Sequence, residues 1–294
     1  MSIALRPIWH RPAVVATLLL AGSFAIGSAA AAGKIIAPSA KIVALDFDVD
    51  NNALFKAYSR TLYLSRTEGR DWEAIALPNV INRGHITSIS IPAKSRGVLY
   101  VAGPGFGVLR SEDDGRRWNA INSGLPSNDV VALSSHADQP ETLYVLVARR
   151  GIFRSEDAGS HWRLMDTGPR AKVVQFVHSN MPGSMQTGWL FAATARGVSR
   201  SMDCFCGWRD AGALGRPVTA VAYQRAHPKE VYAAAKDALF FSADGGEHWS
   251  PLPSPGHNVS ALVATPAGTL YAAVSSGGLF RSADAGMTWH RVDE

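Results

Sequence analysis

Aspartate recurs along this sequence at a near-constant spacing, each time between a serine and a tryptophan. The six copies align on Ser-x-Asp-x-Gly-x-x-Trp and occupy residues 65–72, 111–118, 155–162, 201–208, 242–249 and 282–289. The carboxylate can accept backbone N–H groups across a tight turn, the glycine supplies a positive φ, and the tryptophan buries a large ring. These residue types predict structural turns, which we call boxes.

The residues expected to carry this structural role stand at the Asp, Gly and Trp positions of the boxes. They are Gly69, Trp72, Asp113, Gly115, Trp118, Asp157, Gly159, Trp162, Asp203, Trp208, Asp244, Gly246, Trp249, Asp284, Gly286 and Trp289. Two boxes depart from the pattern, since Thr67 replaces the aspartate of the first and Phe205 replaces the glycine of the fourth. We expect these two turns to be altered without loss of the fold.

Cys204 and Cys206, the two cysteines of the chain, flank Phe205 inside the fourth box. They form either a pair of surface thiols or a local bridge. A bridge between residues i and i+2 closes a small, strained ring that is easily reduced. Two thiolates cannot complete a tetrahedral zinc site on their own. A disulfide scaffold is excluded, and a redox or metal role is the less favoured alternative.

Other metal-binding patterns are weak. Asp46 and Asp48 alternate on a predicted strand and could face a cation in a central channel near Ser90 and Ser134, but a water-filled polar channel is the favoured interpretation. The histidines are scattered over different predicted loops: His136, His161, His178, His227 and His248. We therefore expect no metal site and no cofactor.

The spacing of the boxes, about 40 to 46 residues, is typical of a propeller blade, which holds four short strands. In the third repeat, β-branched and aromatic runs at 130–135, 143–147 and 151–154 precede the box. A fourth run, at 162–165, begins at the box tryptophan. Equivalent runs recur in the other repeats, and no long helical period occurs outside the N-terminal segment. We predict an all-β fold, a six-bladed β-propeller of four-stranded antiparallel blades with box turns, over residues 41–294.

The boxes and their spacing resemble the Asp-box, or bacterial neuraminidase repeat, superfamily of β-propellers. This superfamily includes sialidases, sortilin ectodomains and propellers of the photosystem II assembly factor type, and the non-catalytic members are the most similar in style. The resemblance extends over nearly the whole chain after the N-terminal segment. It implies that the boxes lie between the third and fourth strands, on the face opposite the usual site, so that their carboxylates are structural. Nothing in the sequence indicates photosynthesis.

Residues 1–32 have the pattern of a secretory signal peptide. Arg6, His10 and Arg11 form a basic start, an uncharged apolar run follows, and small residues precede Gly33. An uncleaved anchor helix is the alternative. We expect cleavage, a linker at 33–40, and a periplasmic or secreted protein without stable membrane insertion. Removal of the two arginines and no acid leaves the mature chain mildly basic.

Basic residues gather in the segments that should form the end of the propeller opposite the boxes. They are Arg60, Arg83, Arg149, Arg150, Arg170, Lys172, Arg196, Arg216 and Lys236, with His85 and His257 nearby. Asp129 and Asp237 are the acids expected there. The box end carries Glu68, Asp71, Glu112, Asp113, Asp114, Glu156, Asp157, Asp203, Asp244, Glu247 and Asp284. We predict a two-faced molecule that docks an anionic partner, a protein complex or an acidic glycan, on its basic end.

A glycoside hydrolase is the alternative function. It needs two carboxylates about 5 to 10 Å apart, whereas Asp129 and Asp237 fall in the third and fifth repeats. The Phe/Tyr-Arg-Ile-Pro motif of sialidases is absent, and no glutamate accompanies Tyr58. Nucleic acid is excluded because the basic residues lack interleaved exposed aromatic side chains. We predict a monomeric binding platform with no catalytic residue.

Overall fold

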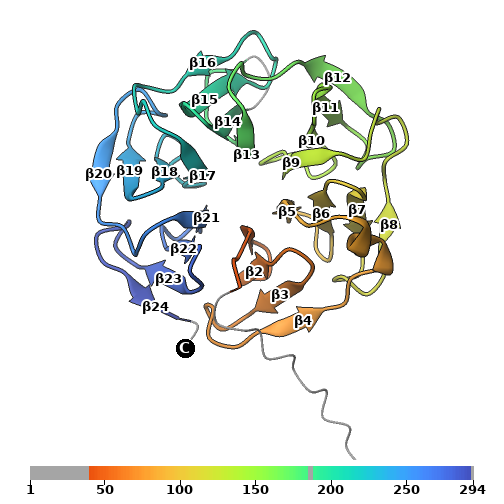
Figure 1. Cartoon of the computed structure of the whole chain (residues 1–294), viewed down its shortest axis with the longest axis horizontal. Helices are drawn as coiled ribbons and strands as arrows, with labels where there is room; N and C mark the ends of the chain where they lie inside the picture. Colours follow the sequence, from red (N-terminus) through yellow and green to blue (C-terminus); the bar gives the residue numbers. More distant parts are fainter. Residues whose placement is uncertain (1–39, 185–187, 293–294) are drawn as a thin grey trace, which may run out of the picture. The chain divides into compact units, whose positions relative to one another are not determined.

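The computed structural model describes residues 40–184 and 188–292. The predicted signal peptide and all but the last residue of the predicted linker lie outside the described residues. The predicted fold is confirmed: six four-stranded antiparallel sheets are arranged as the blades of a β-propeller (Figure 1). Within the described residues, no helix is long and apolar enough to cross a lipid bilayer.

The strands of each blade are hydrogen-bonded in chain order, so every blade is complete in itself. The first strand of each blade lies nearest the axis of the propeller (Figure 1). These inner strands are β1 (Ala44–Asp48), β5 (Ser88–Ser90), β9 (Val130–Ser135), β13 (Val173–Ser179), β17 (Val218–Tyr223) and β21 (Val259–Ala264). The second strands are β2 (Ala53–Ala57), β6 (Leu99–Gly103), β10 (Leu143–Val147), β14 (Trp189–Thr194), β18 (Val231–Ala235) and β22 (Leu270–Val274).

The third and fourth strands lead outward. The third strands are β3 (Leu62–Ser65), β7 (Gly107–Ser111), β11 (Gly151–Ser155), β15 (Gly197–Met202), β19 (Ala238–Ser242) and β23 (Leu279–Ser282). The outermost strands are β4 (Glu73–Ile75), β8 (Asn119–Ala120), β12 (Arg163–Asp166), β16 (Arg209–Asp210), β20 (Ser250–Leu252) and β24 (His290–Arg291). A short 3-10 helix, η1 (Asn79–Arg83), links the first two blades.

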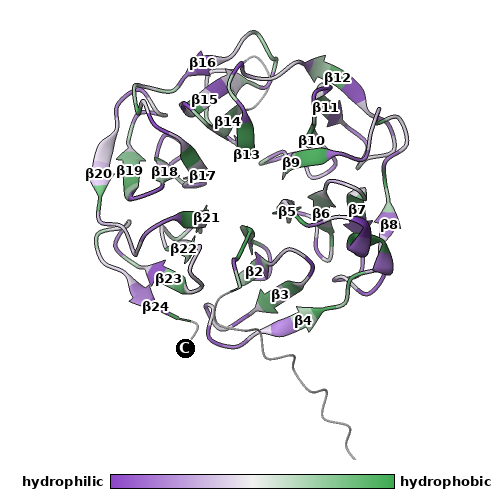
Figure 2. Cartoon of the chain, in the orientation of Figure 1, coloured by the Kyte–Doolittle hydropathy of each residue, from purple (hydrophilic) through white to green (hydrophobic). Residues whose placement is uncertain are grey.

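Burial explains this layering. All residues of β2, β6, β18 and β22 are buried, because both faces of these strands pack against neighbouring blades. The outermost strands β8, β16 and β24 are exposed and only two residues long, and β24 is hydrophilic (Figure 2). Short polar edges protect a sheet from pairing with another chain. The apolar core therefore lies between the blades.

The first and last blades close the ring without exchanging a strand. Leu54 of β2 packs in one buried cluster with Tyr271 of β22 and Leu279 of β23. Ser260 Oγ donates to the carbonyl oxygen of Ile42 at 2.8 Å. Arg281 and Glu68 form an ion pair of 3.5 Å across the same seam. Side-chain packing and polar contacts thus join the first and last blades, each of which is complete in itself.

Candidate functional site

Five of the boxes share one turn geometry. In the second, third and sixth boxes, the Oδ1 atoms of Asp113, Asp157 and Asp284 each accept the backbone N–H four residues further on, at 2.8 Å. In the fifth box Asp244 accepts the same bond at 3.0 Å. The box glycines have φ between 84° and 95°. The box serine, which the sequence reasoning did not use, accepts the glycine N–H in all five.

The expected alteration of the first box is wrong. Thr67 Oγ1 accepts the N–H of Asp71 at 2.8 Å, which is the bond that aspartate makes in the other boxes. Gly69 keeps φ at 90°. A hydroxyl oxygen has the lone pair that this turn requires, so threonine substitutes for the carboxylate.

The fourth box is altered more deeply than expected. Phe205, at the glycine position, has φ of 55°, and Cys204 and Cys206 form a disulfide across it. Asp203 does not take the role predicted for it, since it turns inward, is fully buried and accepts a bond from Ser184 Oγ at 2.9 Å. A carboxylate held in the interior needs such donors because burial removes its water.

The box tryptophans link neighbouring blades. The indole N–H groups of Trp118, Trp162, Trp249 and Trp289 donate to backbone carbonyl oxygens of the preceding blade, at 2.7 to 3.0 Å. Trp208 donates instead to the carboxylate of Asp166 at 2.8 Å. Trp72 in the first blade bonds within its own box, to Gly69. Five of the six box tryptophans are therefore seam residues, and their role extends beyond packing within one blade.

Every predicted partner-binding residue is exposed. In the turns between second and third strands lie Arg60, Arg149, Arg150, Arg196 and Lys236, and in the connections between blades lie Arg83, Arg170, Lys172 and Arg216. Because the strands are antiparallel, these segments share the end opposite the boxes. Backbone bonds join them there, for example from Ala195 N to Lys172 O at 3.0 Å and from Ile86 N to Ser59 O at 2.8 Å. We call this end the basic end.

The two ends differ in how their charges are satisfied. At the box end, carboxylates pair with neighbouring cations, as in Glu112 with Arg110, Glu156 with Arg154 and Asp138 with Arg225. At the basic end, none of the predicted partner-binding residues forms an ion pair with any residue that the structure describes. The basic end thus leaves these cations available to a partner, whereas several carboxylates of the box end are paired.

A groove at the basic end brings two of the predicted residues together. It has a volume of about 730 Å³ and lies between the first two blades. Arg60 and Arg83 line it, together with Lys41 and His85 and the ring of Tyr58. None of the described residues that line this groove carries a carboxylate. The other predicted residues lie on separate blades around the ring, and Arg216 places its guanidinium 5.5 Å from the ring of Phe240.

The groove adjoins the axial channel, because Lys41 and His85 line both. The channel encloses about 620 Å³, and Asp46 is the one carboxylate among its lining residues. Asp46 accepts the N–H groups of Phe47 and Ile91, each at 2.8 Å. Enclosure in the channel wall raises the pKa of Asp46 to about 7.

Asp48 does not share the channel with Asp46. Its carboxylate accepts the backbone N–H of Asp50 at 2.9 Å and the side-chain amide of Asn51 at 2.7 Å, and so closes a turn. Asp46 and Asp48, the two aspartates considered for a channel cation, therefore do not face the same site. The hydroxyl groups of Ser90 and Ser135 form a hydrogen bond of 2.9 Å in the channel wall.

The two carboxylates predicted for the basic end do not share a blade. Asp129 and Asp237 belong to different blades, and Asp237 faces Nδ1 of His257 at 3.2 Å. Asp166, which sequence reasoning overlooked, also reaches this end, but it accepts the N–H of Gly168 and the indole of Trp208. Two carboxylates flanking one bond are the requirement for glycoside hydrolysis. These positions do not meet it.

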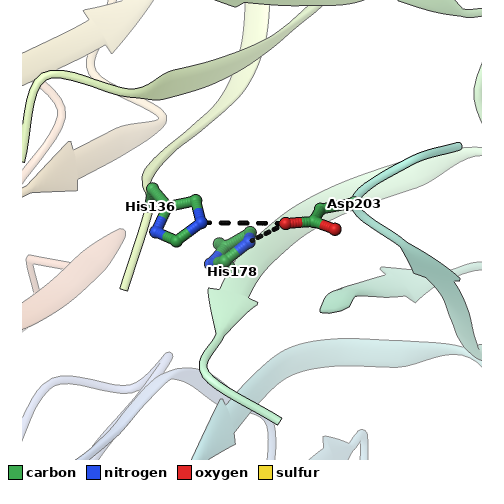
Figure 3. A group of neighbouring side chains, drawn as sticks. All are labelled: His136, His178 and Asp203. Carbon is green, nitrogen blue, oxygen red and sulfur yellow. Dashed lines mark ion pairs between the residues drawn. The ribbon is translucent and has the colours of Figure 1, made fainter. Parts of the chain in front are cut away.

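Two histidines expected to lie apart are brought together. His136 follows β9 in the third blade, His178 lies on β13 in the fourth, and Asp203 belongs to the fourth box (Figure 3). The Nε2 atoms of His136 and His178 lie 3.7 and 3.5 Å from Asp203 Oδ2, and all three side chains are buried. The histidine rings stack with their centroids 4.0 Å apart.

The tautomers of these histidines argue against a metal in this cluster. His178 Nδ1 accepts the N–H of Ala137 at 3.0 Å, and His136 Nδ1 accepts the N–H groups of Asp138 and Gln139 at 3.0 and 3.1 Å. A neutral imidazole whose Nδ1 accepts carries its proton on Nε2. The Nε2–H of His178 then lies 3.5 Å from the carboxylate, where a metal would need the lone pair of that nitrogen. Burial lowers the pKa of His178 to about 4, which keeps this ring neutral.

Comparison with known proteins gives the fold and no family. No family model and no curated protein matches the chain. The GH74 xyloglucanase of Xanthomonas campestris is similar with a TM-score of 0.62 and 15% identity, over 88% of this chain and 55% of that one. This chain thus spans about half the length of that enzyme. YCF48 from Cyanidioschyzon merolae is similar with a TM-score of 0.57 and 18% identity, over 88% of both chains. A structure of YCF48 bound to D1 peptide has a TM-score of 0.51 and 17% identity, over 79% of this chain and 74% of that one.

Proposed function

We propose that this protein is a non-catalytic binding or assembly platform that docks an anionic partner on its basic end. The observation that carries the proposal is the set of exposed cations at the basic end, none of which forms an ion pair with a described residue. Clustered like charges repel one another, and an anionic partner relieves that repulsion while it gains from electrostatic steering.

The groove supplies the contact at which such a partner would be held. Arg60 and Arg83 are guanidinium groups, which bind carboxylates and phosphates in a two-pronged geometry. Lys41 adds a third cation beside the channel mouth. We favour an acidic protein segment as the ligand. The likeness to a propeller solved with a bound peptide supports a protein partner by analogy of fold alone.

Export is part of this proposal. The cleaved signal peptide inferred for residues 1–32 would deliver the propeller to the periplasm or the exterior as a soluble monomer. The Cys204–Cys206 disulfide suits that destination, because disulfides persist in oxidising compartments. The mass of the native protein tests the claim: a mature N-terminus near Ala32 or Gly33 is expected, and an intact N-terminus in the membrane fraction would contradict it.

The partner can be sought by affinity capture from the native extract. The wild-type protein is compared with a variant in which Arg60, Arg83, Arg149, Arg150 and Arg196 are changed to Ser. We expect a partner that is retained by the wild type, released by moderate salt and absent from the variant. An acidic glycan that competes with this partner would shift the assignment to carbohydrate binding. Hydrolysis of an oligosaccharide by the wild type would overturn the non-catalytic assignment.

A further inference from the structure

Within the described residues, the fourth box shows neither of the two bonds that close the other five turns. In those turns the box serine and the box aspartate or threonine each accept a backbone N–H. In the fourth, Ser201 Oγ donates to Met202 O at 3.0 Å, and Asp203 faces the interior. Among the contacts of the described residues, the turn is held by the bonds from Phe205 N to Met202 O, at 2.9 Å, and from Asp203 N to Gly188 O, at 3.1 Å, and by the disulfide.

The disulfide thus constrains the turn in place of the hydrogen bonds that the box serine and aspartate form elsewhere. It spans Phe205, whose positive φ is costly for a bulky side chain without such a constraint. It joins residues separated by one position, so it cannot tie distant parts of the fold together and contributes little to global stability. Its effect falls on the turn that carries Asp203.

Asp203 connects this turn to the blade next to it. Ser184 and His178 approach it from the fourth blade, and His136 approaches it from the third. The backbone amides of residues 137–139 are bonded to the two imidazole rings. We call the three residues His136, His178 and Asp203 the clamp. If the turn shifts, the clamp carboxylate shifts with it, and the amides at 137–139 lose their fixed acceptors.

We propose that the Cys204–Cys206 disulfide is a redox-responsive lock on the joint between the third and fourth blades. Cys206 is exposed, so a dithiol reductant can reach it. A reductant thiolate attacks Cys206 Sγ, the S–S bond breaks, and Cys204 leaves as a thiolate that takes up a proton. The second reductant thiolate then attacks the mixed disulfide and releases the thiolate of Cys206. Two electrons pass to the protein, and the reductant ends as a disulfide.

Hydrogen exchange of the mature protein, oxidised and reduced with a dithiol, tests the lock. The chain-entropy relation for so small a loop corresponds to roughly tenfold in the opening equilibrium of the turn. We therefore expect about tenfold faster exchange on reduction at 202–208 and at 137–139, and no change in the third box, at 155–162. The variant Cys204→Ser with Cys206→Ser should exchange like the reduced protein and ignore the reductant.

The variant Asp203→Asn tests the role of the clamp independently of the disulfide. In this variant the amides at 137–139 should already exchange fast, and reduction should change only 202–208. Faster exchange at 202–208 of the wild type without any change at 137–139 would overturn the proposal, because the turn would then open without moving the clamp. Cysteines that resist the dithiol and alkylation in the folded protein would overturn it as well.

Discussion

Replacing Trp162 with alanine tests the role of the box tryptophans as seam residues. The ring is partly buried and packs against the apolar cluster of the second and third blades. Its indole donates to Ile121 O of the preceding blade at 2.8 Å. Burial of about 150 Å² of apolar surface stabilises by about 4 kcal/mol, and the hydrogen bond adds about 1 kcal/mol.

We expect Trp162→Ala to lower the free energy of unfolding by about 5 kcal/mol, at the upper end of the range for large-to-small replacements. Urea unfolding followed by circular dichroism measures it. Trp162→Phe keeps most of the ring and loses the bond, so its cost should be about 1 to 2 kcal/mol. A loss below about 1 kcal/mol for the alanine variant, or equal losses for both variants, would refute the assignment of Trp162 to the seam.

Three further results are expected. Thr67→Asp should keep the first box intact and Thr67→Ala should weaken it, as judged by the melting temperature, because Thr67 Oγ1 accepts the N–H of Asp71. The hydrogen bond from His161 lowers the pKa of Asp157 to about 2, so stability from this turn should be present above pH 4 and fade as the pH falls toward 2; Asp157→Ala removes that dependence. Burial lowers the pKa of His178 from 6.5 to about 4. Because the unfolded chain then binds more protons, stability should fall by up to about 3 kcal/mol between pH 6.5 and 4, and His178→Asn should flatten this slope in urea unfolding.

The blades and box turns were predictable because they are repeated. Five of the six boxes form the same local bonds, and the strands between boxes follow from runs such as Leu143–Val147 bounded by turn residues. The location of the basic residues was also predictable, since antiparallel order alone decides which turns share an end. Lys41 was overlooked because it stands at the boundary with the predicted linker, although it lines both the groove and the channel.

The clamp could not be read from the sequence. His136 and His178 belong to different repeats, and they meet only because the third and fourth blades pack side by side. Asp203 matches the box pattern in type and spacing, so the pattern assigned it the usual role. Its inward turn depends on the donors around it and on the disulfide beside it, neither of which a linear motif contains. The replacement of glycine by Phe205 and the two cysteines that flank it were the local signals of this change.

Binding of a fluorescent polyglutamate peptide, measured by anisotropy at low and moderate salt, tests the central claim most directly. The double variant Arg60→Glu with Arg83→Glu reverses two of the charges that line the groove. Arg66→Glu with Arg116→Glu is the matched control, since both residues are exposed at the box end; Arg117 is unsuitable because it pairs with Asp113. We expect the wild type and the control to bind with an affinity that falls steeply with salt, and the groove variant to bind at least about tenfold more weakly with an unchanged melting temperature. Equal losses for both variants, or binding that ignores salt, would contradict a basic end that docks an anionic partner.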